Sequence, residues 1–407
     1  MSRRIRWLIA SAMIVLSAAL AACDGPSSTS HSDPPSPVVM PPVCTKDGPV
    51  VFALSGRQNS PAPGLTGTMQ AAAARAVDSG SAIGLVTVDG KPRLVAASSF
   101  SDSTAGNENA LAADRASYLR QLESAVAGLR ATAPHADVLD ALDKAGRAVR
   151  AACPYGGTVY LADSGLSETG PMDFRQSGLL EARPSEVVAF LAALHELPHL
   201  KGISVVLVGI GDTAAPQHPL SIAQRSNLIA IWSAIAKAGG ATSVQIDQSP
   251  LSGPAPAHVP PVLLVPVPAE PVWTAPANVS SSNSELGVFP DSGPVGFEPD
   301  TTVFRQPAAA QAALRPLARY LAANPSVGIL LTGTTARWGS LTGCKALARE
   351  RADRVRAVLV QMGARPSQIK TQGLGWEFRG YINDQGPGGT LLPGPAEHNR
   401  SVLVSKL

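Results

Sequence analysis

The sequence predicts an α/β protein with two folded units. Residues 49–246 alternate short apolar strands with helical stretches, an order typical of a doubly wound domain with helices on both faces of one sheet. A strand such as 204–208 (SVVLV) is apolar on both faces, as a strand covered from both sides must be. Residues 295–407 carry two further β-α-β units, which are long enough to bury a smaller core of their own.

The individual elements follow from hydrophobic periodicity and from turn residues. In the first unit the expected strands are 50–54, 82–88, 93–97, 158–162, 204–208 and 244–246. The expected helices there are 68–77, 110–131, 136–151, 184–195 and 221–238. In the second unit we expect a helix reaching Leu321, a strand over 327–331, a long helix over 344–362, and strands over 368–372 and 401–404.

A proline-rich segment separates the two units. Ten prolines lie between Pro250 and Pro290, a density that excludes helices and interior strands. We therefore expect a first domain at 49–249, a semi-rigid extended linker at 250–294 and a second domain at 295–407.

Composition and charge argue against nucleic-acid binding. The formal net charge is +3, and three of the arginines lie in an N-terminal segment that we expect to be removed. Aromatic residues make up 4% of the chain, too few for a base-stacking surface, and no basic cluster is present.

No pattern of catalytic residues stands out either. His195-Glu196-Leu197-Pro198-His199 matches the HExxH string of zinc proteases, but Pro198 would break the helix on which that chemistry depends. The sequence therefore predicts no enzyme activity and no cofactor.

The N-terminal sequence is typical of a bacterial export signal. Met1–Ala22 combines a basic start with an uncharged apolar run that is short for a membrane-spanning helix. It ends in Leu20-Ala21-Ala22-Cys23, which resembles the lipobox where the Cys thiol receives a diacylglycerol. Residues 23–48 are rich in Ser and Pro and suit a flexible tether. We expect a lipid anchor at Cys23 on the extracytoplasmic face of a membrane; the alternative is an ordinary signal peptide followed by an unrelated cysteine.

Lipidation of Cys23 leaves three other cysteines in an oxidising compartment. Cys44 and Cys153 each precede a predicted strand of the first domain, so we expect these two to form a disulfide and Cys344 to stay free.

The first domain resembles the von Willebrand factor A family. The resemblance rests on an opening strand that enters a Ser-Gly turn, a central strand that ends in an Asp, and two later glycine turns. These landmarks are Val51–Gly56, Asp163–Gly165, Gly209–Asp212 and Gly239–Gly240. The resemblance implies a surface for binding other proteins.

The metal site of that family is expected to be degenerate here. It needs an Asp-x-Ser-x-Ser motif, a loop Thr and a further Asp. The motif falls on Ser55, Arg57 and Asn59, and the Thr position falls near Ala136. Asp163 is the one ligand retained, so we expect no metal ion.

The second domain resembles the OmpA C-terminal-like family. The matching stretches are Phe297–Thr302, Asn324-Pro325, Leu331–Thr335, Gly339, Leu347–Val355, Gly363, Gly373–Gly375 and Asn399–Val402. The resemblance implies a mixed sheet and non-covalent binding of peptidoglycan through the diaminopimelate of its stem peptide. It places the contacts to the stem peptide at Thr335, Arg351, Asn399 and Arg400.

The position of Arg351 on its helix also argues for a site. Arg351 lies on the apolar stripe of the helix, four residues from both Leu347 and Val355. A guanidinium facing the core is costly unless it is paired, whereas at the wall of a pocket it can grip a carboxylate with two bonds. The alternatives are that Arg351 extends to solvent at the edge of the stripe and that Arg400 only guards a sheet edge.

One departure from the family pattern concerns the ligand's ammonium group. The family usually has an Asp directly after the Gly-x-Thr turn, and here that position is Ala336. Asp384 and Glu377 in the following loop are possible substitutes, and spacing selects neither. We therefore expect weakened or altered binding to the wall, for example to an amidated stem peptide or to another anion.

Together these features predict a lipid-anchored envelope protein that links a membrane to peptidoglycan. The alternative function is an envelope adaptor whose second domain has lost peptidoglycan binding and contacts proteins instead. The partner of the first domain and the choice of membrane stay open.

Overall fold

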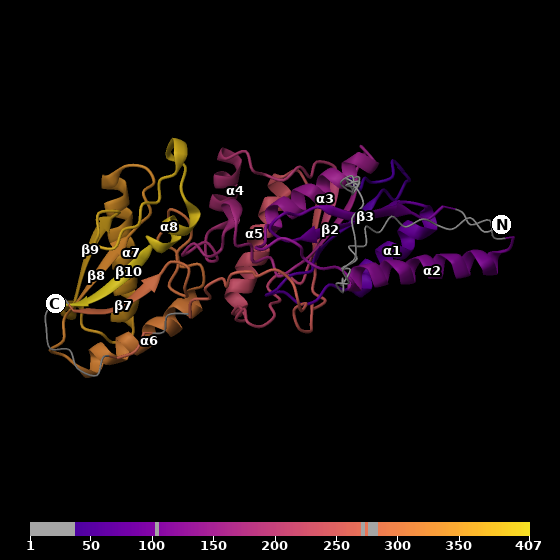
Figure 1. Ribbon diagram of the computed structural model, residues 1–407. Coiled ribbons are helices and arrows are strands. Elements are labelled where there is room, and N and C mark those ends of the chain that lie inside the picture. Colours follow the sequence, from indigo (N-terminus) through magenta and orange to yellow (C-terminus); the bar gives the residue numbers. More distant parts are fainter. Residues whose placement is uncertain (1–36, 102–105, 270–272, 276–283) are drawn as a thin grey trace, which may run out of the picture.

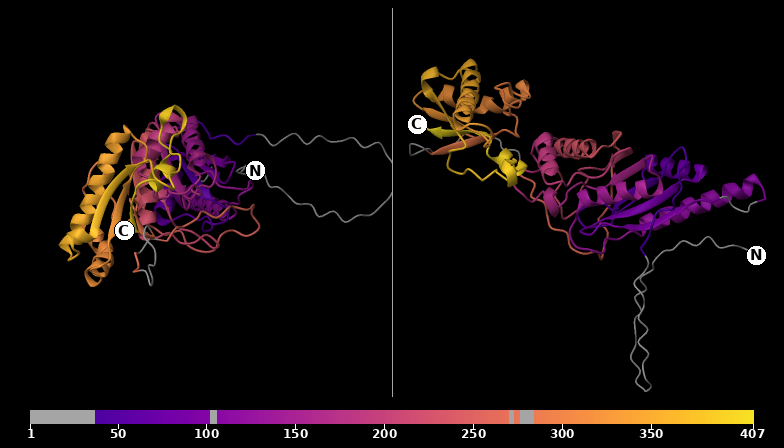
Figure 2. Two further views of the ribbon diagram at one scale, coloured as in Figure 1. Left: turned by 90° about the vertical axis from the view of Figure 1, so that its left-hand side faces the viewer. Right: turned by 90° about the horizontal axis from the view of Figure 1, so that it is seen from above.

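The computed structural model describes residues 37–101, 106–269, 273–275 and 284–407, so the signal segment and Cys23 lie outside the described residues. The described chain forms two α/β domains that lie end to end (Figures 1 and 2). No helix among the described residues is both long and apolar enough to span a membrane.

The N-terminal domain contains a six-stranded sheet in the order β3-β2-β1-β4-β5-β6. Its strands are β1 (Val50–Ser55), β2 (Ala82–Val88), β3 (Leu94–Ser99), β4 (Gly157–Ala162), β5 (Ile203–Val208) and β6 (Ser243–Asp247). The edge strand β3 pairs antiparallel with β2, and the other pairs are parallel. Every residue of β1 and β2 is buried, as the apolar strands predict for a sheet covered on both faces.

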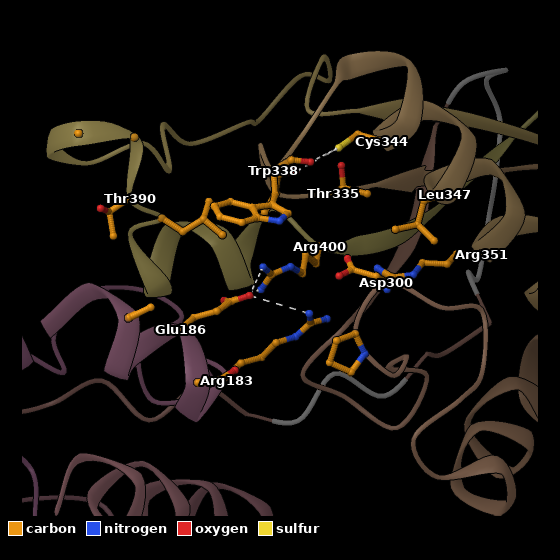
Figure 3. Close-up of a pocket in the computed structure, with 17 residues that line it drawn as sticks. Arg183, Glu186, Asp300, Thr335, Trp338, Cys344, Leu347, Arg351, Thr390 and Arg400 are labelled. Atoms are coloured by element: carbon orange, nitrogen blue, oxygen red, sulfur yellow. Dashed lines mark hydrogen bonds and ion pairs between the residues drawn. The ribbon is translucent and has the colours of Figure 1, made fainter. Parts of the chain in front are cut away.

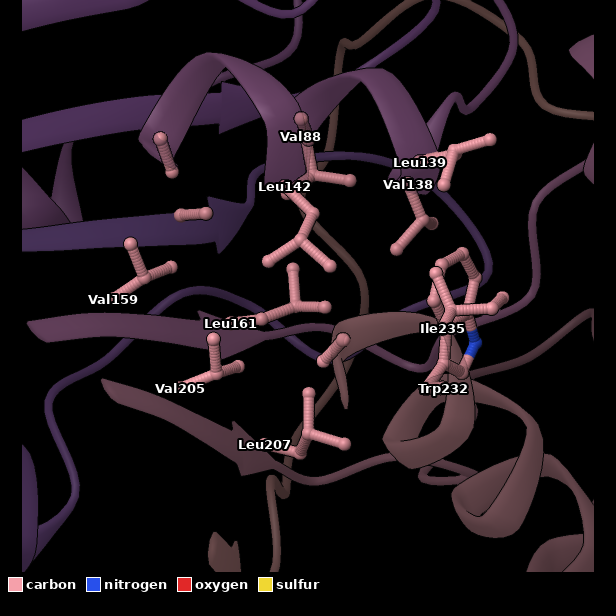
Figure 4. Close-up of a cluster of buried hydrophobic side chains, with 14 of the residues drawn as sticks. Val88, Val138, Leu139, Leu142, Val159, Leu161, Val205, Leu207, Trp232 and Ile235 are labelled. Atoms are coloured by element: carbon pink, nitrogen blue, oxygen red, sulfur yellow. The ribbon is translucent and has the colours of Figure 1, made fainter. Parts of the chain in front are cut away.

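Helices cover both faces of this sheet (Figure 1). They are α1 (Gly67–Ser79), α2 (Glu108–Ala127), α3 (Val138–Ala152), α4 (Pro184–Ala193) and α5 (Ile222–Ala238), with a short 3-10 turn at Gly170–Met172. A hydrophobic core lies on each face of the sheet, and strand β1 contributes side chains to both, because alternate side chains point to opposite faces. Phe52 belongs to the core beneath α1 and α2. Val51 belongs to the core beneath α3, α4 and α5, where Leu142 and Trp232 also pack (Figure 4).

The expected disulfide is present in this domain. Cys44 and Cys153 are bonded, with their Cα atoms 4.8 Å apart, and Cys344 is free and buried. Cys153 caps the C-terminus of α3, so the bond ties the segment before β1 to that helix.

The C-terminal domain contains a four-stranded mixed sheet in the order β7-β10-β8-β9. Its strands are β7 (Glu285–Pro290), β8 (Ile329–Thr334), β9 (Ile369–Gly375) and β10 (Ser401–Lys406). Strand β10 is antiparallel to both of its neighbours, and β8 and β9 are parallel. The helices are α6 (Pro307–Ala323), α7 (Leu341–Gln361) and α8 (Pro393–His398), with 3-10 turns at Pro366–Gln368 and Pro387–Gly389.

The range expected for the linker, 250–294, includes a strand of the C-terminal domain. Strand β7 lies inside the range assigned to the linker and forms an edge of the second sheet. Pro290 is tolerated there because it stands at the end of an edge strand. The earlier part of the range is extended but packed on the N-terminal domain: the side chain of Gln217 donates a hydrogen bond to the carbonyl of Val265 and accepts one from its amide, both at 2.9 Å.

Candidate functional site

A cavity of about 550 Å³ lies between α4 of the N-terminal domain and the C-terminal domain (Figure 3). Its wall combines three arginines, two carboxylates, one buried hydroxyl and several apolar side chains. The lining residues that matter for the chemistry are Arg183, Glu186, Asp300, Thr335, Arg351 and Arg400.

Arg351 is buried at the wall of this cavity, with 4% of its surface exposed. Its Nε donates to the carbonyl oxygen of Thr301 at 3.0 Å, and its Nη2 donates to that of Glu298 at 3.3 Å. The guanidinium also lies over the ring of Phe297, 5.1 Å from the centroid. Val355 is buried one turn further along α7, as the apolar stripe predicts.

The charge of Arg351 is not neutralised by an ion pair. No carboxylate among the described residues lies within 4.0 Å of its nitrogens. Burial lowers the pKa of Arg351 from its ordinary value, and the pull of Asp291 in the opposite direction is smaller. Two of the three guanidinium nitrogens are held by backbone carbonyls, and Nη1 has no acceptor among the described residues. This arrangement leaves a positive charge ready for an anion in the cavity.

Arg400 already has partners. Arg400 directly precedes β10; its Nη2 donates to Oε1 of Glu186 at 2.5 Å, and its Nη1 donates to Oε2 of Glu186 at 3.0 Å. Nη1 also donates to Oε2 of Glu397 at 3.2 Å. Burial would lower the pKa of Arg400, but the carboxylates of Glu186 and Glu397 hold it above its ordinary value. Arg400 is therefore no solvated edge residue.

A second ion pair joins the domains beside the cavity. Nη2 of Arg183 donates to Oδ2 of Asp291 at 2.8 Å, and Arg305 reaches the same oxygen at 3.2 Å. Burial would raise the pKa of Asp291, but Arg305, Arg183 and Arg351 together hold it below its usual range. Glu397 shows the opposite behaviour, because burial and the nearby charge of Asp291 raise its pKa to about 7.

Two more lining residues carry polar side-chain groups. Thr335 is 5% exposed, and its Oγ1 has no hydrogen-bond partner among the described residues. Asp300 is exposed to the cavity beside the guanidinium of Arg351 and forms no ion pair within 4.0 Å among the described residues (Figure 3). A cation, a carboxylate and a free hydroxyl on one cavity wall match the groups of an amino-acid head, which carries both charges.

Asn399 does not line the cavity. Its Oδ1 accepts from the amide of Ile382 at 3.0 Å, and its Nδ2 donates to the carbonyl of Ile382 at 2.7 Å and to Asp384 at 3.0 Å. The amide group therefore holds the loop before α8, which gives Asn399 a positioning role instead of the expected contact with a ligand.

Neither proposed substitute for the missing Asp reaches the cavity. Asp384 is fully buried, and its Oδ2 accepts from the amide of Arg337 at 2.9 Å. Glu377 pairs with Lys345 at 2.7 Å. Asp300 lies within Phe297–Thr302, one of the stretches that carry the family resemblance. Its place in the cavity beside Arg351 became evident only from the structure. No local pattern indicated Arg183 or Glu186.

The place expected for a degenerate metal site holds an internal cation. Nε of Arg57 donates to Oδ2 of Asp163 at 3.0 Å, and its Nη2 donates to Oδ1 at 2.8 Å. Both side chains are 0% exposed. Nη2 also donates to Oγ of Ser164 at 3.0 Å and to the carbonyl of Leu166 at 3.2 Å. The guanidinium thus neutralises Asp163, the one carboxylate retained from the metal motif. A metal ion at this place would have to displace the guanidinium.

The comparisons with known proteins concern the C-terminal domain. Residues 296–388 match the model of the OmpA family, so this part of the chain is an OmpA-like domain. None of the curated proteins matches the chain.

Solved structures resemble about a third of the chain. The peptidoglycan-associated lipoprotein of Burkholderia pseudomallei is 24% identical over 30% of this chain and 89% of its own, with a TM-score of 0.24. The periplasmic domain of Helicobacter pylori MotB is 22% identical over 31% of this chain and 78% of its own, also with a TM-score of 0.24. The OmpA-like domain of FopA1 from Francisella tularensis is 16% identical over 33% of this chain and 87% of its own, with a TM-score of 0.23.

Proposed function

We propose that the OmpA-like domain binds peptidoglycan non-covalently and that this protein thereby attaches part of the cell envelope to the wall. The observation that carries the proposal is the unpaired guanidinium of Arg351, buried at the wall of a cavity of about 550 Å³. A stem peptide offers free carboxylates, and a guanidinium with an unused nitrogen is suited to bind one.

We further propose that Asp300 binds the ammonium group of the same diaminopimelate residue. The usual Asp after the Gly-x-Thr turn is replaced by Ala336, whose side chain offers no acceptor. Asp300 reaches the cavity from the loop before α6 instead, and Thr335 adds a free hydroxyl. This arrangement supports binding of an unmodified, zwitterionic side chain, in place of the altered ligand that Ala336 alone suggested.

The remaining parts of the chain complete this proposed role. A lipid on Cys23 would hold the protein to the extracytoplasmic face of a membrane. The N-terminal domain, interpreted as a von Willebrand A-like domain without a metal ion, would present a surface to an envelope protein. Neither domain is proposed to catalyse a reaction or to hold a cofactor.

A second candidate function is an adaptor that has lost wall binding. The observation in its favour is that Arg400 is already engaged by Glu186, with its shortest hydrogen bond at 2.5 Å. In that case the cavity would serve only as the junction between the two domains.

Co-sedimentation of the full chain with purified peptidoglycan distinguishes the two functions. We expect Arg351→Ala to weaken binding roughly 10- to 100-fold, because a charge-assisted hydrogen bond contributes about 1.5–3 kcal/mol. Arg349→Ala is the matched control, since Arg349 is exposed on the same helix. Thermal unfolding of each variant separates lost binding from lost folding. Equal retention of the wild type and Arg351→Ala, or no retention of the wild type, favours the adaptor.

A further inference from the structure

Helix α4 of the N-terminal domain projects two charged side chains into the peptidoglycan-binding cavity. Arg183 is the residue just before the helix, Pro184 occupies its first turn, and Glu186 follows within that turn. In the loop before α4 the backbones of the two domains also approach closely: a Cβ on Gly178 would lie 2.3 Å from the carbonyl oxygen of Gly394. The contact is therefore tight enough to hold Glu186 in a defined position.

The geometry of Glu186 is that of a bound ligand carboxylate. Each of its oxygens accepts one hydrogen bond from a different nitrogen of Arg400, at 2.5 and 3.0 Å. This two-bond fork is the arrangement that arginine adopts with carboxylates in recognition sites. The side chain of Glu186 is 17% exposed and that of Arg400 is 7% exposed, so the pair is largely shielded from water.

Resting on the proposed function, we propose that Glu186 is a built-in competitor that occupies Arg400 until a stem-peptide carboxylate replaces it. Arg351 and Arg400 line the same cavity, but only Arg400 is neutralised from the other domain. A ligand that uses both arginines must displace Glu186, and this displacement breaks an ion pair that joins the domains.

The competitor couples wall binding to the arrangement of the domains. In the closed state Glu186 holds Arg400, and Arg183 holds Asp291 beside it. In the ligand-bound state the first of these bridges is lost. Because linkage is reciprocal, closure weakens peptidoglycan binding by the same factor by which binding favours opening. Coupling of this kind commonly changes affinity about 5- to 150-fold.

The test compares binding of a soluble, diaminopimelate-containing muropeptide monomer to full-length variants. Glu186→Ala is expected to bind at least about 5-fold more tightly than the wild type, because Nη2 of Arg400 is then free for the ligand while Nη1 keeps its bond to Glu397. Glu196→Ala is the matched control: Glu196 lies just past the C-terminus of α4 and is exposed, so the charge change is the same but the cavity is untouched. Replacing Arg400 as well as Glu186 by alanine should abolish the gain.

A second variant guards against misfolding, and a hydrogen-exchange measurement reports separation of the two domains directly. Glu186→Gln keeps the size of the side chain and removes its charge, and it should gain affinity in the same direction. Hydrogen exchange of the α4 and α8 backbone should rise when the wild type binds the muropeptide, since the contact between these helices is released.

The outcomes separate the two proposals. If the wild type binds through Arg351 but Glu186→Ala binds equally well, Glu186 is no competitor. If Glu186→Ala binds more weakly, Glu186 is part of the ligand site and the inference is overturned. If neither the wild type nor Glu186→Ala binds, peptidoglycan is not the ligand, and the proposed function fails together with the competitor that rests on it.

Discussion

The Arg57→Met substitution should destabilise the N-terminal domain by about 3–5 kcal/mol, the usual cost of removing one partner of a buried ion pair. Methionine is unbranched and uncharged but shorter than arginine, so a small cavity adds to this cost. Asp163 would lose its two bonds from Arg57, at 3.0 and 2.8 Å. It would keep the hydrogen bonds from the amide of Gly165 at 2.7 Å and from Oγ of Ser164 at 3.5 Å. A fully buried carboxylate would then lack its counter-charge.

A double-substitution cycle isolates the pair itself. Asp163→Asn alone leaves the guanidinium of Arg57 buried without a carboxylate and should cost a similar amount. The two substitutions together remove both charges. Their combined cost should therefore be smaller than the sum of the single costs by about 2–3 kcal/mol.

Hydrogen exchange followed by mass spectrometry gives the required resolution. Peptides from β1 and β4 report unfolding of the N-terminal domain, and peptides from β8 and β10 serve as an internal control within the same chain. If Arg57→Met lowers the unfolding free energy of the N-terminal domain by less than about 1 kcal/mol, the pair is not a main stabilising element of this domain.

Three further predictions concern stability. The pKa of Glu397 is raised from 4.5 to about 7, so the folded chain binds the proton of this carboxyl group more tightly than the unfolded chain. The protonated group therefore stabilises the fold fully below about pH 4.5. This stabilisation, up to about 3 kcal/mol, is lost as the pH rises through 7. Urea unfolding at pH 5 and pH 8 should show this loss, and Glu397→Gln should abolish it. Cys44→Ser opens a disulfide that spans 109 residues and should cost about 2–5 kcal/mol; a reductant should lower the Tm of the wild type but leave that of the variant unchanged. Gly333→Ala would place a Cβ 1.9 Å from the carbonyl oxygen of Ala348, so the C-terminal domain should lose roughly 1–3 kcal/mol in thermal unfolding; an unchanged Tm would show that β8 can move away from α7.

Most of the fold could be predicted because hydrophobic patterning encodes it locally. The parallel strands are apolar on both faces, so β4 and β5 were expected within one residue of their observed bounds. Two elements were not predicted because each contains a proline, which argues against a strand or a helix. Strand β7 ends in Pro290 at a sheet edge, and α8 begins with Pro393 at a position where a helix tolerates proline.

The candidate site could be predicted only in part. Arg351 follows from helical periodicity together with a family resemblance, because a charge on an apolar stripe is a local signal. Glu186 and Arg183 reach the cavity only because two domains dock, and no local sequence pattern encodes that docking. Asn399 was expected to bind ligand on resemblance alone, but its hydrogen bonds hold the loop at Ile382.

The central claim is that Arg351 and Asp300 bind the two charged ends of one diaminopimelate side chain. A crystal structure of the full chain soaked with a stem-peptide fragment tests it most directly. The account predicts a ligand carboxylate within hydrogen-bond distance of Nη1 of Arg351, with the ligand ammonium on the carboxylate of Asp300. A fragment bound elsewhere on the domain, or with its ammonium group away from Asp300, would contradict the account.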